Sequence, residues 1–328
     1  MKYLIEKSSV PVLWLDTFAI TQIAYAIFQK EQGQKYNKKL FEQFTQLVHL
    51  RVAKKIIIFE SDQLLEIAVR EELVKLSKRV LSQLSGGLIV HSWEVREKQL
   101  MLALNAFAKT STTETINWSD IYSDDPLKDR GILGFLIRCD FGINLRLNQK
   151  RKMDAAIYSN WKNIRNKYSN SSNKSNFLKQ YKLEKSSGSR LAQDTISKVN
   201  EGIFTKHHPL YFNLIDGPGS YLDALIPNVT SPESIMIDFY KSSYFIDLPM
   251  KDISSILFAE RLCGSEDIKK SDQTDIENIS AFLPYVNYMI IDKAMADKVI
   301  KHKLDKKYNA KIIRLNDLDE VIKSCAQH

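Results

Sequence analysis

The chain has 328 residues, with 47 Lys and Arg against 39 Asp and Glu, a formal net charge of +8, and 44% of its residues are hydrophobic. These values are typical of a soluble globular protein with one large or two modest domains; the 11 Gly and 8 Pro exclude collagen-like and Pro/Gly-rich disordered chains. Cys139, Cys263 and Cys325 are far apart and form no CxxC or Cys/His cluster, which argues against a disulfide framework or a structural zinc site.

The sequence also predicts where the protein works. The scattered cysteines favour a reducing compartment. Residues 1–10 lack the uninterrupted apolar run of a signal peptide, and no stretch approaches the roughly 20 apolar residues that span a bilayer. We therefore expect a cytoplasmic protein that does not contact a membrane.

The first 91 residues alternate between strand and helix patterns. Short apolar runs predict buried strands at residues 11–15, 55–59 and 88–90, and apolar residues at helical spacing predict helices at 17–30, 36–52 and 61–84. Gly86 and Gly87 end the last of these helices. This alternation is typical of an α/β domain with parallel strands.

The character of the chain changes after His91. Residues 92–243 show mostly helical periodicity and polar loops, without a convincing run of strands. The α/β pattern then returns, with helices predicted at 252–263, 275–283 and 293–303 and strands at 288–291 and 311–315. We therefore predict one α/β domain, formed by residues 1–91 and 245–328, that is split by a mainly α-helical insertion over residues 92–244.

The insertion carries a strongly basic segment. Residues 146–190 hold twelve Lys and Arg against Asp154 and Glu184, a net charge of +10, with aromatic residues interleaved. Lys and Arg neutralise phosphates while bases stack on aromatic rings, so this composition suits a nucleic-acid-binding surface; the alternative is a solvated helical hairpin whose aromatics face its own core. The candidate nucleic-acid-binding residues are Lys150, Arg151, Lys152, Trp161, Lys162, Arg165 and Lys167. We expect Trp161 to be exposed, and Trp14 and Trp93 to lie in the core.

Acidic residues stand at or just after the ends of the predicted strands. They are Asp16, Glu60 and Asp292, with Asp62 and Glu66 in the helix after the second strand and Asp272 and Asp275 where the helix at 275–283 begins. Open α/β sheets keep their sites at these strand ends, and gathered carboxylates repel one another unless a hard divalent cation neutralises them. Each acid alone could instead cap a helix or face solvent. Their joint placement favours a metal site.

These residues resemble the acidic tetrad of the PIN-like domains. The resemblance rests on Asp16 in VLWLDTFAI, Glu66 in IIIFESDQLLEI, and Asp275 and Asp292 in SDQTDIENISAFLPYVNYMIIDKAMADKVI. It covers residues 10–91 and 245–315 and implies a parallel sheet flanked by helices. It also implies Mg²⁺- or Mn²⁺-dependent hydrolysis of phosphodiester bonds, most often in RNA.

By this resemblance, Asp16, Glu66, Asp275 and Asp292 are the catalytic and metal-binding residues. Asp272 and Glu60 are expected as extra ligands and Asp62 as a weaker one. The chain departs from compact members of the family by its insertion of about 150 residues between the second and third acids. It also has Ile290 and Ile291 where a small hydroxyl residue commonly precedes the last acid.

The sequence thus predicts a metal-dependent endonuclease, an RNase, that uses a metal-activated water, with the basic segment holding the strand over the acids. The family makes a toxin or phage-defence role plausible. Two alternatives remain open. One is a catalytically degenerate module that binds nucleic acid, and the other is a protein-interaction component with a regulatory partner or inhibitor. DNA stays open as the substrate, and the sequence indicates neither an oligomeric state nor the number of metal ions.

Overall fold

The structure is a computed structural model that describes residues 1–61, 63, 71–122, 155–156, 158–166, 174–226 and 231–327. The chain forms two compact units. The helical unit consists of Met1–Leu4, Arg96–Ile116 and Trp161–Ile268. The sheet unit consists of Ile5–Val95, Asn117–Asn160 and Lys269–His328. The sheet unit is thus built from separated segments of the chain, and its last segment begins at Lys269, whereas we placed the return of the α/β domain at residue 245.

A four-stranded parallel sheet lies at the centre of the sheet unit. Its order is β3-β2-β5-β6, with β2 at Val12–Leu15, β3 at Ile57–Ile58, β5 at Tyr288–Ile290 and β6 at Lys311–Ile313. The predicted strand at residues 88–90 contributes a single parallel bridge between Ile89 and Glu60, outside β3. The α/β class and the parallel pairing are therefore confirmed.

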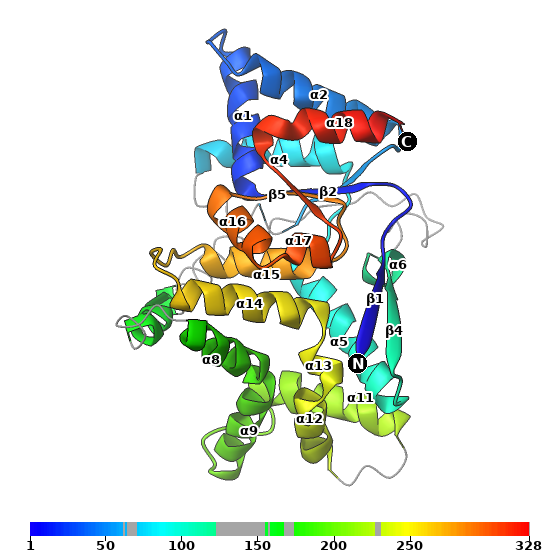
Figure 1. Cartoon of the computed structure of the whole chain (residues 1–328), viewed down its shortest axis with the longest axis vertical. Helices are drawn as coiled ribbons and strands as arrows, with labels where there is room; N and C mark the ends of the chain where they lie inside the picture. Colours follow the sequence, from blue (N-terminus) through cyan, green and yellow to red (C-terminus); the bar gives the residue numbers. More distant parts are fainter. Residues whose placement is uncertain are drawn as a thin grey trace. The chain divides into compact units, whose positions relative to one another are not determined.

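Most helices of the sheet unit follow or precede a strand (Figure 1). They are α1 (Thr17–Glu31), α2 (Lys38–Val52), α4 (Glu71–Ser85), α6 (Trp118–Ile121), α15 (Asp272–Phe282), α16 (Lys293–Lys301), α17 (Leu304–Lys307) and α18 (Leu318–Gln327), with a 3₁₀ turn at Leu315–Asp317. Residues 92–95, the start of α5 (Ser92–Ala108), also belong to this unit.

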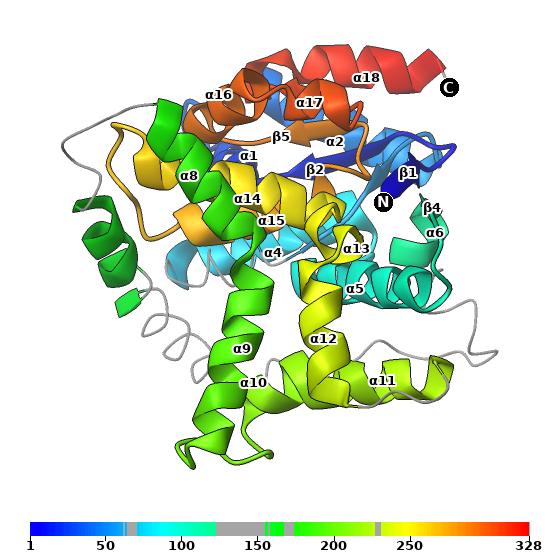
Figure 2. The same cartoon turned by 60° about the horizontal axis from the view of Figure 1, so that its bottom comes forward.

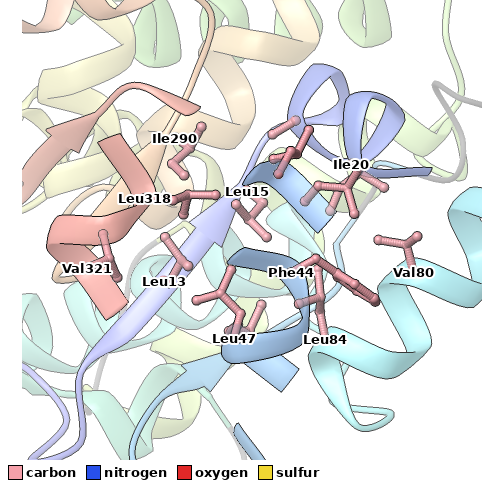
Figure 3. Packing of buried hydrophobic residues seen from close by; sticks show 14 of the residues in the cluster. Leu13, Leu15, Ile20, Phe44, Leu47, Val80, Leu84, Ile290, Leu318 and Val321 are labelled. Carbon is pink, nitrogen blue, oxygen red and sulfur yellow. The ribbon is translucent and has the colours of Figure 1, made fainter. Parts of the chain in front are cut away.

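One face of the sheet is covered by α1, α2, α4 and α18. Leu13 and Leu15 of β2 are buried there with Ile290 of β5, among apolar residues of these four helices (Figure 3). Because side chains alternate across a strand, Trp14 points to the opposite face. It contacts Phe282 of α15 there, with the ring centroids 5.5 Å apart. Burial on both faces explains why β2 is apolar throughout.

The helical unit has a core of its own. Its helices are α5 from Arg96 onward, α8 (Lys174–Lys185), α9 (Ser187–Asn200), α10 (Pro209–Tyr211), a π-helical turn (Phe212–Asp216), α11 (Gly217–Leu225), α12 (Pro232–Lys241), α13 (Ser243–Ile246) and α14 (Pro249–Cys263). α8 packs against α14, and α9 packs against α12. In Figure 2, α8 passes in front of α14. Leu104, Ile215, Leu222, Met236 and Phe239 are fully buried in this core.

A second, two-stranded sheet pairs β1 (Lys2–Glu6) with β4 (Thr113–Asn117). β4 is a strand within residues 92–243, where we predicted mostly helices and no convincing run of strands. The described part of the insertion is otherwise helical, as predicted. None of the helices in the described ranges has both the length and the apolar composition that crossing a bilayer requires.

Candidate metal centre

The candidate centre lies where the strand order of the sheet reverses. From β2 the chain goes outward to β3, and from β5 it goes outward to β6 on the other side, so the neighbours β2 and β5 form the switch point. Open α/β sheets bind ligands at the carboxyl ends of such strands. Asp16 directly follows β2, and Asp292 follows β5 by two residues. The two predicted acids therefore stand at adjacent strand ends.

Asp16 and Asp292 both cap helices. The Thr17 N–H donates to Asp16 Oδ1 at 2.7 Å at the start of α1, and the Met295 N–H donates to Asp292 Oδ1 at 2.8 Å at the start of α16. The capping role that we considered is confirmed for Asp16 and Asp292, whereas the N-cap of α15 is Ser271 and not Asp275. A carboxylate has two oxygens and about four acceptor positions, so a cap and a metal contact are compatible.

The other two acids stand on the first turn of α15. Asp272 is 2% exposed, and its Oδ2 accepts a 2.5 Å hydrogen bond from the Lys269 N–H. Asp275 follows three residues later, on the same side of the helix. The start of α15 therefore presents two carboxylates close together.

The charges of these four acids interact. Burial, and then the carboxylates of Asp16, Asp292 and Asp272, raise the pKa of Asp275 from 3.8 to about 8; a hydrogen bond with the Ser271 side chain opposes this shift. Three chain segments thus bring their carboxylates near one side chain. Like charges gathered in this way either retain a proton or attract a cation.

The donor set suits a hard cation. Carboxylate oxygens are the ligands that Mg²⁺ and Mn²⁺ prefer. Within the described ranges, however, no three Asp, Glu, His or Cys side chains lie close enough together to hold a metal ion in the present arrangement. Glu66, a predicted fourth ligand, and Asp62 lie outside the described residues.

Glu60 occupies a different place from the four aspartates. It follows β3, and its side chain is 1% exposed. Its backbone N–H donates to the Leu88 carbonyl at 2.9 Å, and its carbonyl accepts from the Val90 N–H at 2.8 Å. The expectation that Glu60 is an extra metal ligand stays a prediction.

Two uncharged residues that the sequence analysis did not select support the end of β2. Gln63 is fully buried; its Nε2 donates to the Leu15 carbonyl at 2.8 Å, and its Oε1 accepts from the Ser61 N–H at 2.5 Å. The Ser61 Oγ in turn accepts from Trp14 Nε1 at 3.1 Å. These bonds hold the residue just before Asp16. The only sequence signal was the polar SDQ run directly after a buried strand.

Asn278 is a third residue that the sequence pattern did not indicate. It lies on α15 three residues after Asp275 and is 1% exposed. Its Oδ1 accepts no hydrogen bond from any described residue. A buried acceptor without a protein donor is usually satisfied by a bound water or an ion. It is therefore one more oxygen on the side of α15 that carries Asp275.

The candidate nucleic-acid-binding residues have other contacts. Trp161, which we expected to be exposed, is only 9% exposed and packs edge-on against Phe258 of α14, with the ring centroids 5.2 Å apart; that expectation was wrong. The Arg165 guanidinium donates to the carbonyls of Gly264 and Glu266. Lys162 is exposed. The remaining candidates, Lys150, Arg151, Lys152 and Lys167, lie outside the described residues.

Comparisons with family models, with curated proteins and with solved structures found no match to this chain. The resemblance to the PIN-like family therefore stays a prediction. It rests on the acidic motifs and on their places in the sequence.

Proposed function

We propose that this protein is a metal-dependent endonuclease of the PIN-like type that hydrolyses phosphodiester bonds, with RNA as its preferred substrate. The observation that carries the proposal is the aspartate cluster at the switch point of the parallel sheet. Asp16 and Asp292 stand at adjacent strand ends. Burial, and then the carboxylates of Asp16, Asp292 and Asp272, raise the pKa of Asp275 to about 8. A cluster that keeps a proton near neutral pH is poised to exchange it for a cation.

Asp16, Asp275 and Asp292 would hold Mg²⁺ or Mn²⁺, with Asp272 beside them and Glu66 as the further ligand that the sequence predicts. When bound, such an ion lowers the pKa of a water and stabilises negative charge on a phosphate. The helix caps fix one oxygen of Asp16 and one of Asp292, so little side-chain freedom is left to lose on binding.

Asp275 has a separate role in this proposal. At neutral pH its carboxyl carries a proton, since its pKa lies at about 8. That proton reduces the repulsion among the four acids and leaves when a cation enters. Without a cation, an ionised cluster would repel the phosphates of the substrate. Metal loading and substrate binding are thereby linked.

The test compares purified wild type with Asp16→Asn on labelled single-stranded RNA and DNA in Mg²⁺, Mn²⁺ or EDTA. Asn caps helices about as well as Asp, so the variant should keep its fold. Asp297→Asn, at an exposed position of α16, is the matched control. We expect wild type and the control to cleave RNA only with metal, and Asp16→Asn to lose at least about 100-fold in rate, a loss typical of removing one transition-state contact. Equal rates for wild type and Asp16→Asn would refute the proposed site.

One observation favours a second candidate, a catalytically degenerate module that binds nucleic acid. Among the described residues, no three acidic side chains lie close enough together to hold a metal ion. The same experiment separates the two functions. RNA binding by wild type without cleavage in any metal would support the degenerate module.

A further inference from the structure

Trp93 is a large aromatic side chain on the surface of the sheet unit. We expected it in the core, but 53% of it is exposed. Its ring stacks on that of His91, with the centroids 6.0 Å apart and the planes 17° from parallel. More than half of the Trp93 surface thus remains open to a second flat partner.

The backbone around this ring pair is fixed. Glu94 Oε2 accepts from the His91 N–H at 3.3 Å, and the His91 carbonyl accepts from the Val95 N–H at 3.2 Å. Trp93 therefore stands on the first turn of α5 and loses little backbone freedom when something stacks on it. Preorganisation of this kind favours binding.

The ring pair lies at the same edge of the sheet as the aspartate cluster. Residues 88–90 run parallel to the end of β3, with Ile89 bridging Glu60. His91 therefore emerges at the carboxyl edge, as Asp16 does. The order along this edge is residues 88–90, β3, β2 and β5, and neighbouring strands are about 4.8 Å apart. The ring pair then begins two strand spacings, about 10 Å, from the end of β2.

Cationic residues stand at the other side of the cluster. Lys293 follows Asp292 at the end of β5, and Arg314 follows β6, the outer strand. Both side chains are exposed. The carboxyl edge of this one sheet thus presents an aromatic pair, four aspartates and two cations in that order.

We propose that this edge is a track for single-stranded nucleic acid that crosses the strand ends of the sheet. One unpaired base stacks on Trp93, a phosphate nearby lies over the aspartates, and the backbone beyond them contacts Lys293 and Arg314. The proposal rests on the proposed nuclease function and narrows its substrate class. A base can stack on an exposed side-chain ring only when it is not already stacked on the next base of its strand. A duplex keeps its bases stacked and is therefore not bound in this way.

The test measures binding separately from cleavage. Every protein carries Asp16→Asn to prevent turnover, and the fluorescence anisotropy of a labelled 10-nucleotide RNA is titrated in Mn²⁺, as a single strand and as a duplex. The variants are Trp93→Ala and Trp93→Phe, and Tyr25→Ala is the matched control because Tyr25 is 49% exposed on α1. Base stacking is worth about 1–3 kcal/mol, so Trp93→Ala should weaken single-strand binding about tenfold or more. Trp93→Phe should keep most of the affinity, and duplex binding should not change.

The cationic end is tested by salt dependence. The double variant Lys293→Gln, Arg314→Gln should lower the slope of log Kd against log salt by about 1.4, since each phosphate contact to a single strand contributes about 0.7. Trp93→Ala should leave this slope unchanged. Equal slopes for the double variant and its parent would show that Lys293 and Arg314 do not contact the phosphates.

The outcomes separate this inference from the proposed function. If wild type cleaves RNA but Trp93→Ala binds single strands as tightly as its parent, the nuclease function stands and the track is overturned. If binding depends on Trp93 but wild type cleaves nothing, the track stands and the nuclease function is overturned. A parent protein that binds no single strand overturns the track outright.

Discussion

The backbone N–H of Asp16 donates to the carbonyl oxygen of Ile290 at 2.9 Å. This bond continues the β2–β5 ladder, in which Leu15 pairs with Ile290, by one residue. Asp292 follows only two residues later, so this backbone hydrogen bond helps to fix the separation of the two strand-end aspartates. Substitutions at either aspartate should therefore change the charge of the cluster without moving its frame.

The raised pKa of Asp275 predicts a pH dependence of stability. Between about pH 4 and pH 8 the folded state holds a proton that the unfolded state has released, because the pKa is about 8 when folded and 3.8 otherwise. The contribution of Asp275 to the free energy of unfolding is therefore most favourable below pH 4 and falls as the pH rises to 8. In EDTA, Asp275→Asn should be more stable than wild type at pH 8 and not at pH 4. Urea unfolding at both pH values measures this, with Asp297→Asn as the control; a pH-independent difference would contradict it.

Metal addition should stabilise the protein through the same cluster. A ligand that binds only the folded state at 100 times its Kd adds about 2.7 kcal/mol to the free energy of unfolding. Mn²⁺ should therefore raise the melting temperature of wild type and of Asp297→Asn, but not that of Asp275→Asn. Because the cation displaces the proton of Asp275, its apparent affinity should increase from pH 6 to pH 8. Calorimetric titration in buffers of different ionisation enthalpy detects the released proton, and a titration without proton release would count against this linkage.

We expect Gln63 to contribute more to the free energy of unfolding than its lack of charge suggests. Gln63→Leu leaves the Leu15 carbonyl without this donor and the Ser61 N–H without this acceptor, and each loss in a buried site costs about 1–3 kcal/mol. We expect a loss of about 2–4 kcal/mol in the free energy of unfolding. Gln34→Leu, at an exposed position, is the control and should change it by less than about 0.5 kcal/mol. Urea unfolding of the two variants tests this, and equal stabilities would show that the buried amide does not support β2.

The two tryptophans should behave in opposite ways. Trp161→Ala removes a buried ring that packs on Phe258 and should cost about 3 kcal/mol of stability or more. Trp93→Ala, at an exposed ring, should cost less than about 1 kcal/mol and act on RNA affinity instead. Thermal unfolding and anisotropy titration of both variants check the contrast. A stable Trp161→Ala protein with weakened RNA binding would reverse these assignments.

The sequence predicted the central strands and their acids well because both signals are local. A run such as VLWL is apolar at every position when a strand is buried on both faces, and the Asp that closes it caps the next helix. The same reasoning found β5 and Asp292, and placed Asp275 at the start of its helix, although that helix begins three residues earlier, at Asp272. Local pattern was sufficient at these places.

The features that the sequence did not predict depend on contacts between residues that are far apart in the chain. β1 alternates exposed and half-buried residues, and its partner β4 lies more than 100 residues later, so neither strand has a distinct apolar run. Trp161 stands among charges yet is buried by Phe258, which lies on another helix. Gln63 gains its role by reaching Leu15, 48 residues earlier in the sequence. Such contacts cannot be derived from spacing alone.

The pairing of the central strands also determines when the aspartate cluster can form during synthesis of the chain. The Val12 N–H donates to Asn287 Oδ1, 275 residues further along the chain. Most of the chain must therefore be synthesised before β2 can pair with its neighbour β5. A nascent chain therefore holds Asp16 long before it holds Asp275 or Asp292. If the cluster cuts RNA, the message under translation is safe from its own product until the chain is almost complete.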